Sequence, residues 1–300
     1  MTIEKYDFIV LGGGGTGLAA AMYAARLRLK TLVLGHTHGT EAAVGGVITT
    51  THLVENYPGF TRISGTELAK NLEYHARSYD LVTIKNEKAL EIKKNANSFS
   101  IKTNKSEYLA KTILFATGTK WRKLEGVENA EKMEGKGVSH CALCDGPLYK
   151  NKVVAVIGGS DSAAKDALLL AEYAKKVYII YRGEQIHPEP INMERIKSNK
   201  KIEVINKTNI KGIRGKDFAE YVALDKPYEG KKELKVDGIF VAIGHIVLSD
   251  LAKPLGVKLN KEGEIIIDHK TAETNIPGIY AARDVTEKHF KQLITGVADG

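Results

Sequence analysis

Two glycine-rich turns, each between a short apolar run and a helical pattern, constrain the fold of this 300-residue chain more than any other feature. The first turn, residues 12–17, follows the apolar run 7–11 and precedes an alanine-rich helical pattern over 18–29. The second turn, residues 158–163, follows the apolar run 152–157 and precedes another helical pattern. Strand, glycine turn and helix in this order form a mononucleotide-binding unit. The sequence therefore predicts an α/β protein with two Rossmann-like three-layer domains.

Other periodic segments fill the remainder of the chain. A helical pattern covers residues 65–79, and short alternating runs around Ile92, 99–101 and Tyr108 predict a small antiparallel meander. Residues 112–118 predict a separate buried strand, and residues 278–285 predict a strand that ends in an acid. These elements are compatible with the first of the two domains.

The first turn has the G-x-G-x-x-G spacing at Gly12, Gly14 and Gly17. The first glycine permits the tight turn, the second leaves room for a pyrophosphate, and the third allows close packing of helix on strand. The amides at the start of the helix offer hydrogen bonds to phosphate oxygens. We therefore expect a dinucleotide site here, although Gly35 and His36 stand where an acid for the ribose hydroxyl is expected.

The only two cysteines, Cys141 and Cys144, lie just before the second turn. Two thiols at this spacing can close a small redox-active disulfide, whereas an isolated pair cannot complete a four-ligand zinc site. The alternatives are half of a metal site or two inert core thiols. Because Asp145 and Gly146 follow the pair and glycine turns lie on both sides of it, the redox interpretation is favoured.

The second turn departs from the nucleotide-binding pattern. Its middle position, where bare backbone must approach a pyrophosphate, is Ser160. An added Cβ there obstructs or shifts that approach.

Seven segments, in order, carry a resemblance to a known family: GGGGTG, ENYPG, FATG, CALCDG, VIGGSDSA, VAIGH and YAARDV. Over essentially its whole length the chain resembles the low-molecular-weight thioredoxin reductases. The resemblance implies an FAD-binding domain of residues 1–119 and 245–300. It also implies an inserted pyridine-nucleotide-type domain of residues 120–244 that carries the cysteine pair.

The resemblance also implies an FAD site in which the glycine turn faces the pyrophosphate, Thr50 and Asn56 approach the flavin, and Asp284 binds the ribityl chain. Gln292 is expected to begin a helix that points at the flavin pyrimidine. The implied FAD residues are Gly12, Gly14, Gly15, Thr16, Gly17, Gly46, Thr50, Asn56, Ala116, Thr117, Gly118, Asp284, Lys291 and Gln292. Two departures from the family are Val47, where glutamine is usual, and Arg283, where glycine is usual.

For the second domain, the resemblance implies a nicotinamide nucleotide site that retains Gly158, Ser160, Ala163 and Arg182. Family members that use NADPH grip its 2′-phosphate with several arginines, and Gly183 and His187 replace two of them here. At about 1.5–3 kcal/mol per charge-assisted hydrogen bond, this loss weakens NADPH binding by several orders of magnitude. We expect a domain that keeps its fold and has largely lost NADPH, with a preference for NADH as the alternative.

The catalytic residues implied by the resemblance are Cys141, Cys144 and Asp145. Two electrons are expected to pass from reduced FAD through the disulfide to thioredoxin or a similar small redox protein. Cys144 is expected to lie against the flavin, Cys141 to be the outward nucleophile, and Asp145 to shuttle a proton. The alternative role of Asp145 is a helix cap. His140 is expected to be an exposed loop residue.

Because one disulfide cannot meet flavin and protein partner in one geometry, the family rotates its domains, and residues 118–120 and 244–245 are the expected linkers. Three other functions stay open: a dithiol oxidase that uses oxygen, a reductase fed by ferredoxin or another carrier, and a non-catalytic flavin-binding sensor.

Composition limits the partners. The 44 basic and 36 acidic residues give a net charge of +8, but no basic stripe with interleaved aromatic residues is present, so we expect no nucleic-acid partner. No window is apolar enough to span a membrane, and no secretory leader precedes the first strand, so we expect a cytoplasmic protein. The resemblance further implies a homodimer.

Overall fold

The computed structural model describes residues 3–36, 44–288 and 290–300. The chain separates into two compact units, Met1–Lys120 with Ile246–Gly300, and Trp121–His245. Each predicted domain limit lies one residue before the observed one. The chain passes between the units in β7 (Thr119–Trp121) and β16 (His245–Val247), which form a two-stranded sheet.

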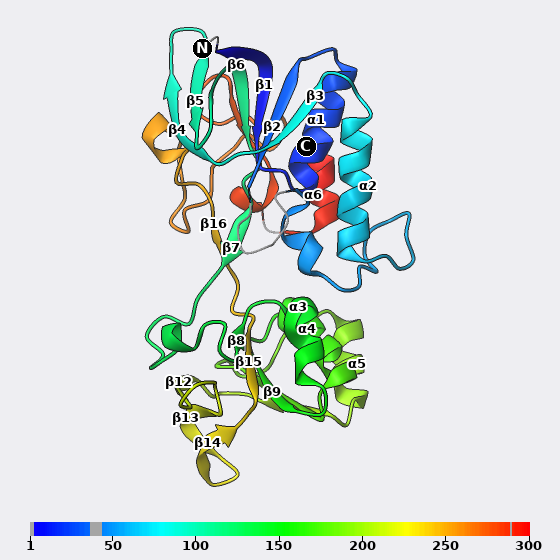
Figure 1. Ribbon diagram of the computed structural model, residues 1–300, viewed down its shortest axis with the longest axis vertical. Coiled ribbons are helices and arrows are strands. Elements are labelled where there is room, and N and C mark those ends of the chain that lie inside the picture. Colours follow the sequence, from blue (N-terminus) through cyan, green and yellow to red (C-terminus); the bar gives the residue numbers. More distant parts are fainter. Residues whose placement is uncertain (1–2, 37–43, 289) are drawn as a thin grey trace. The chain divides into compact units, whose positions relative to one another are not determined.

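The first unit is built on a seven-stranded sheet with the order β3-β2-β1-β6-β5-β4, in which β17 also pairs with β6. β1, β2, β3, β6 and β17 pair in parallel, whereas β4 and β5 extend the sheet as an antiparallel meander. Three helices lie side by side against the sheet (Figure 1). The strands and helices are β1 (Glu4–Leu11), α1 (Gly15–Arg26), β2 (Thr31–Gly35), α2 (Gly65–Arg77), β3 (Val82–Asn86), β4 (Ala89–Lys94), β5 (Phe99–Thr103), β6 (Glu107–Phe115), β17 (Ile279–Ala281) and α6 (Leu293–Asp299).

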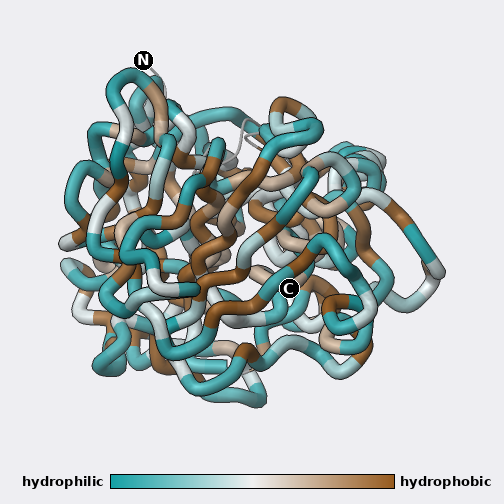
Figure 2. Tube along the Cα trace, turned by 90° about the horizontal axis from the view of Figure 1, so that it is seen from below, coloured by the Kyte–Doolittle hydropathy of each residue, from teal (hydrophilic) through white to brown (hydrophobic). Residues whose placement is uncertain are grey.

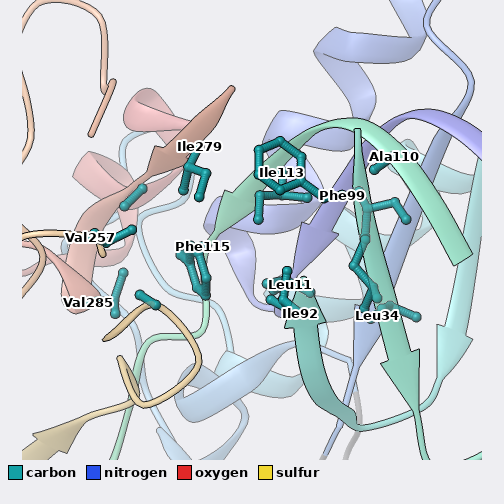
Figure 3. Close-up of a cluster of buried hydrophobic side chains, with 14 of the residues drawn as sticks. Leu11, Leu34, Ile92, Phe99, Ala110, Ile113, Phe115, Val257, Ile279 and Val285 are labelled. Carbon is teal, nitrogen blue, oxygen red and sulfur yellow. The ribbon is translucent and has the colours of Figure 1, made fainter. Parts of the chain in front are cut away.

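Alternation along the central strands divides the core of this unit between the two faces of the sheet. Val10 of β1 packs with Ala20 and Ala21 of α1 on the helical face. Ile113 and Phe115 of β6 belong to a larger cluster on the other face, which also includes side chains of β5 and β17 (Figure 3). Because both faces of the sheet are covered at its centre, β2 is buried at every position.

The second unit has a parallel five-stranded sheet with the order β11-β10-β9-β15-β8 and a separate antiparallel sheet, β12-β13-β14. One core cluster joins the two sheets, and another joins the parallel sheet to the helices, so the unit has three layers. The elements are β8 (Val138–Ser139), α3 (Ala142–Asp145), β9 (Val153–Ile157), α4 (Asp161–Tyr173), β10 (Lys176–Ile180), α5 (Pro190–Ser198), β11 (Ile202–Ile205), β12 (Ile210–Arg214), β13 (Tyr221–Tyr228), β14 (Lys231–Lys235) and β15 (Gly238–Val241).

The predicted α/β fold is confirmed, with corrections at the level of single elements. Helix α1 begins at Gly15, inside the glycine turn, rather than at residue 18, and it ends at Arg26 because Arg28 adopts a left-handed φ of 65°. The two strands predicted around Tyr108 and over 112–118 are one strand, β6, because β1 pairs with it continuously.

Hydropathy agrees with this layering. The outer loops of the trace are mainly hydrophilic, while hydrophobic residues are concentrated along the inner segments (Figure 2). Within the part of the chain that the structure describes, no helix is both long and apolar enough to cross a bilayer.

A carboxyl group on α4 makes the stability of the second unit depend on pH. Burial raises the pKa of Asp166 from 3.8 to about 7. The unfolded chain therefore ionises this group at a lower pH than the folded protein does. Its contribution to folding is neutral below pH 3.8 and becomes increasingly unfavourable up to a pH of about 7.

We predict that Asp166→Asn stabilises the second unit relative to the wild type, increasingly as the pH rises from 4 to 8, because an amide does not ionise. Urea unfolding of both proteins across this range measures the difference. Asp217→Asn, a change at an acid of the same unit with an exposed side chain, is the control. A difference between wild type and Asp166→Asn that does not change with pH would contradict the raised pKa.

Candidate active site

The two cysteines form a disulfide at the start of α3. Cys141 is the N-cap residue of this helix, and its Sγ accepts a hydrogen bond from the backbone N–H of Cys144 at 3.1 Å. The predicted pairing is therefore confirmed. Within the described ranges, no group of three or more His, Cys, Asp or Glu side chains could hold a metal ion.

The two sulfur-bearing residues differ in exposure. Cys141, the predicted outward nucleophile, is only 8% exposed in this oxidised protein, whereas Cys144 is exposed. Asp145 is half-buried at the end of α3, and its side chain does not cap the short 3-10 turn Gly146–Tyr149 that follows. The alternative role of Asp145 as a cap of that turn is therefore wrong. Burial, and then the charges of Asp145 and Asp237, raise the pKa of Tyr149.

His140 is not the exposed loop residue that the sequence predicts. Its ring stacks on Trp121, with centroids 5.8 Å apart and planes 16° apart. Its Nε2 lies 3.1 Å from Oε1 of Glu134. Sequence reasoning missed this contact because nothing in the spacing of residues 121, 134 and 140 indicates that they meet.

In the first glycine turn, Gly12 and Gly17 are required by close contacts with the backbone, and Gly15 packs against a side chain. A Cβ on Gly12, whose φ is +120°, would lie 2.1 Å from the carbonyl oxygen of Ala116. A Cβ on Gly17 would lie 2.0 Å from the carbonyl oxygen of Gly12, and one on Gly15 would lie 2.5 Å from Leu293 of α6. These residues lock the turn to β6 and to two helices.

Gly14 is different, because nothing in the described chain requires a glycine there. Its φ of −77° and ψ of 179° suit any residue, and a Cβ would meet no atom closer than 3.9 Å. Gly14 is also the N-cap of α1, and no side chain of the described residues caps this helix. A helix start without a side-chain cap, with room for a further atom at its N-cap residue, has the features of a phosphate site.

The other predicted FAD residues surround this turn. Gly45, next to Gly46, donates its N–H to the carbonyl of Gly13 at 2.7 Å. The side chains of Asn56 and Gln292 meet, with Nδ2 of Asn56 donating to Oε1 of Gln292 at 3.0 Å. Gln292 is the N-cap of α6, as the resemblance implied.

Threonine hydroxyls among the predicted FAD residues make hydrogen bonds within the chain. Thr50 donates its hydroxyl to the carbonyl of Val47 at 2.8 Å, within the 3-10 turn Gly46–Thr50. Thr117 donates to the carbonyl of Leu248 at 2.6 Å, while Gly118, with φ +63°, borders open space. Thr16 borders Gly296 of α6, where a Cβ would come within 2.7 Å of its hydroxyl.

Arg283 adopts a left-handed φ of 63°, a conformation that favours glycine. Its side chain is 6% exposed, and Nη1 lies 3.3 Å from Oδ2 of Asp299 at the end of α6. Asp284 follows in the same 3-10 turn, and its carbonyl accepts a hydrogen bond from Nζ of Lys291 at 3.2 Å. Lys291 also pairs with the carboxylate of Glu264. The turn that carries Asp284 is therefore intact.

In the second unit, Gly158 is the first glycine of the turn, and like Gly12 it lies too close to a carbonyl oxygen to carry a side chain. A Cβ on Gly158 would lie 2.2 Å from the carbonyl oxygen of Ala242, and buried Ala163 packs against it. Ser160 occupies the place of Gly14, with φ −82° and ψ 177°, and its side chain does not cap α4. Because the two backbones are alike, the side chain of Ser160 occupies the position in the second turn that corresponds to the open space beside Gly14 in the first turn.

Two further features restrict this second turn, and sequence reasoning found neither. The ring of Tyr181 covers the turn so closely that a Cβ on Gly159 or on Gly183 would lie 2.5 Å from it. Asp161, the first residue of α4, carries an ionised carboxylate. Burial raises its pKa, but hydrogen bonds from Lys165, Asn192 and the backbone of Glu189 lower it further, to a value below 3.8.

The predicted phosphate-binding residue Arg182 is exposed. His187 donates its backbone N–H to Gly159 at 2.8 Å and places its ring 5.6 Å from that of Tyr181. A further cation, Lys207, donates its backbone N–H to the carbonyl of Gly183 at 2.9 Å, and its side chain pairs with Glu184.

Comparisons with known proteins agree with this geometry. The pyridine nucleotide-disulphide oxidoreductase family matches residues 6–300. The thioredoxin reductase of Bacillus subtilis is 33% identical over 310 residues, which cover 100% of this chain and 93% of that protein.

Solved structures give the same result. The crystal structure of T. acidophilum thioredoxin reductase is 36% identical to this chain, with a TM-score of 0.91, and the match covers 99% of this chain and 95% of that one. A ferredoxin-flavin thioredoxin reductase from Clostridium acetobutylicum is 30% identical, with a TM-score of 0.50 and coverage of 99% and 94%. The chain therefore belongs to the pyridine nucleotide-disulphide oxidoreductases and, within them, to the low-molecular-weight thioredoxin reductases, and it is a thioredoxin-disulfide reductase-like flavoenzyme.

Proposed function

We propose that this enzyme reduces the disulfide of thioredoxin or a similar small protein, with Cys141 as the nucleophile. The observation that carries this assignment is the hydrogen bond from the N–H of Cys144 to Sγ of Cys141 at 3.1 Å. Such a donor stabilises a thiolate on Cys141 more than a thiol and so favours the reactive form. Because Cys141 is covered in the oxidised protein, the proposal requires that reduction make its sulfur accessible.

The exchange proceeds through a mixed disulfide. The thiolate of Cys141 attacks one sulfur of the partner and releases the other as a thiolate. Cys144 then attacks the sulfur of Cys141, which restores the enzyme disulfide and releases the reduced partner. Asp145, which follows Cys144, takes the role of its proton acceptor, since its carboxylate is not used to cap the following turn.

The residues around the first glycine turn fit FAD. The open space at Gly14 and the uncapped start of α1 suit a pyrophosphate, and the pair Asn56–Gln292 joins the two segments expected beside the flavin. When bound and reduced by the donor, the flavin would supply the two electrons that reduce the disulfide. Asp284, on its intact turn, is proposed to hold the ribityl chain.

The second turn does not fit NADPH. Ser160 places a side chain at the position where the first turn has a glycine, and the ring of Tyr181 covers the turn. We therefore propose that NADPH is a poor donor, with NADH as the alternative. The similarity to the ferredoxin-flavin thioredoxin reductase favours a protein carrier such as ferredoxin as a second candidate donor.

The same proposal includes the cellular compartment and the oligomeric state of the protein. A disulfide that must cycle between its two redox states suits the reducing cytoplasm. Tyr23 of α1, Leu27 at the C-cap of α1, and Tyr74 of the adjacent helix α2 are each more than half exposed, and this supports a homodimer that buries them.

For the cofactor, we predict that Gly14→Val lowers the FAD content of the purified protein at least about tenfold, because the side chain fills the phosphate space while the backbone accommodates it. Ser160→Val is the matched control, since it makes a similar change on the same backbone in the second turn. The FAD content is read from the visible absorbance, and folding from circular dichroism. Full FAD content in folded Gly14→Val would refute the assignment.

For the donor, we predict that NADPH bleaches the bound FAD slowly under anaerobic conditions. A variant that combines Ser160→Gly, Tyr181→His, Gly183→Arg and His187→Arg removes the obstruction and restores two cations. It should bind NADPH about 10²–10⁴-fold more tightly, from two charge-assisted hydrogen bonds of about 1.5–3 kcal/mol each.

Stopped-flow absorbance with NADPH, NADH, reduced ferredoxin and a dithiol compares the donors. Fast bleaching of the wild type by micromolar NADPH would overturn the proposal. Bleaching by ferredoxin alone would identify a carrier-fed reductase, whereas bleaching by the dithiol alone, followed by reaction with oxygen, would identify a dithiol oxidase.

For assembly, we predict that wild-type protein sediments as a dimer and that the double variant Tyr23→Glu, Leu27→Glu sediments as a monomer, because it places charges on the apolar face. Leu90→Glu, at an exposed leucine of β4, should stay dimeric. Analytical ultracentrifugation separates these outcomes, and a monomeric wild type would rule out the interface.

A further inference from the structure

Lysines gather on one edge of the second unit, although they come from three separate segments of the chain. Residues 150–152, 175–176 and 200–201 each contribute two lysines, and each segment lies at the start of a strand, β9, β10 or β11. These three strands are neighbours in the sheet and run in parallel. Because adjacent strands lie about 4.8 Å apart, the fold brings the lysines of all three segments to the amino edge of the sheet.

Backbone hydrogen bonds hold the three segments together. The N–H of Lys175 donates to the carbonyl of Lys152 at 2.8 Å. The N–H of Val177 donates to the carbonyl of Lys201 at 2.9 Å. The Nζ of Lys201 also donates to the carbonyl of Ala171, near the end of α4, at 2.8 Å. The sheet and the helix therefore fix the positions of these lysines.

Most of these cations are not neutralised by acids of the same edge. Lys176 pairs with Glu203 of β11. The carboxylate of Asp237 accepts the backbone N–H of Val153, and Glu172 of α4 is exposed. Among the residues that the structure describes, no ion pair involves the remaining lysines, which are all exposed and which we call the lysine edge: Lys150, Lys152, Lys175, Lys200 and Lys201. An excess of like charge on one edge produces a positive potential that attracts anions.

The lysine edge begins close to the redox-active disulfide. Cys144 is exposed, and only the end of α3 and the 3-10 turn Gly146–Tyr149 separate it from Lys150. A rise of about 1.5–2 Å per residue places the two residues within about 15 Å of each other. The Nζ of Lys152 lies 5.4 Å from the ring centroid of Tyr149, at the end of the same turn. An interface of about 800 Å² per partner is about 30 Å across, so a protein that reaches the disulfide also covers part of the lysine edge.

We propose that the lysine edge is the docking surface for an acidic face of the small disulfide protein that this enzyme reduces. This inference rests on the proposed function and adds the charge that the partner carries beside its own disulfide. Attraction between the two faces raises the rate of association and orients the partner, and it leaves the chemistry of the exchange unchanged.

Nucleic acid is the other class of polyanion that a group of lysines could attract. The three segments that form the lysine edge contain no aromatic residue on which a base could stack. Their place beside the disulfide also favours a protein, because a disulfide exchange brings a protein partner to this part of the unit.

The probes for the test are three synthetic peptides that share one Cys-x-x-Cys disulfide and differ only in four flanking residues, which are all Glu, all Gln or all Lys. The full-length, FAD-loaded protein is reduced with a dithiol that is then removed anaerobically. Rapid quenching with iodoacetamide and mass spectrometry measure the rate at which each peptide is reduced. At about 10 mM salt, the Glu peptide should react at least about tenfold faster than the Lys peptide. At about 0.5 M salt, where charges are screened, the difference should fall below about twofold.

Two variants locate the source of this preference. The first reverses three exposed charges of the lysine edge: Lys150→Glu, Lys175→Glu and Lys200→Glu. The matched control reverses three exposed charges of β14, which lies on the face of the parallel sheet opposite to α3: Lys231→Glu, Lys232→Glu and Lys235→Glu. The edge variant should lose the preference for the Glu peptide and reduce the Gln peptide at the wild-type rate, whereas the control should keep the preference. If the edge variant does not fold, the same three lysines are changed to Gln, and an unchanged preference would then overturn the inference.

The other outcomes separate this inference from the proposed function. Equal rates for the Glu and Lys peptides in the wild type, or an equal loss of preference in both variants, overturn the docking surface and leave the proposed function intact, since the Gln peptide is still reduced. Tighter binding of a labelled single-stranded oligonucleotide than of the Glu peptide, lost in the edge variant, assigns the edge to nucleic acid and also overturns the inference. Failure of the reduced wild type to reduce any of the three peptides overturns both.

Discussion

The close approach of a glycine to the carbonyl of a neighbouring strand end is the contact on which both units depend. Gly12 meets the carbonyl of Ala116 and Gly158 meets that of Ala242, in each case with no room for a Cβ. This contact sets where the first strand stops and the helix starts. It also places the first turn of each helix at the carboxyl ends of the parallel strands, where ligands bind in folds of this type.

The two turns share this contact but have different residues at one equivalent position. Gly14 and Ser160 have nearly the same φ and ψ, so the difference between them is a side chain and not a change of path. The unit that keeps the glycine also keeps its surrounding polar pair, Asn56 and Gln292. In the other unit, the ring of Tyr181 covers the turn, and Arg182 is exposed beyond the end of β10. The packing that defines the fold is therefore shared by two turns whose surroundings differ.

Much of this could be predicted from the sequence, because it depends on local pattern. The glycine turns, the helix over α2 and the apolar strands follow from spacing and periodicity, and the cysteine pair follows from its isolation. The start of α6 at Gln292 came from the resemblance. The rest depends on contacts between distant residues. Tyr108 belongs to the same strand as Phe115 only because β1 pairs with both, and the stack of His140 on Trp121 joins residues with no shared pattern.

The position of Cys141 as the N-cap of α3 has a consequence for the stability of the whole protein. The disulfide closes a loop across a sequence separation of only three residues, so opening it returns little conformational freedom to the unfolded chain. The N–H of Cys144 bonds to the sulfur of Cys141 within the same turn of the oxidised protein. For so short a loop, the loop-entropy relation gives the disulfide a contribution of about 2 kcal/mol to stability, which is less than a disulfide that closes a long loop would give. Each redox cycle therefore changes the folding free energy by only this limited amount.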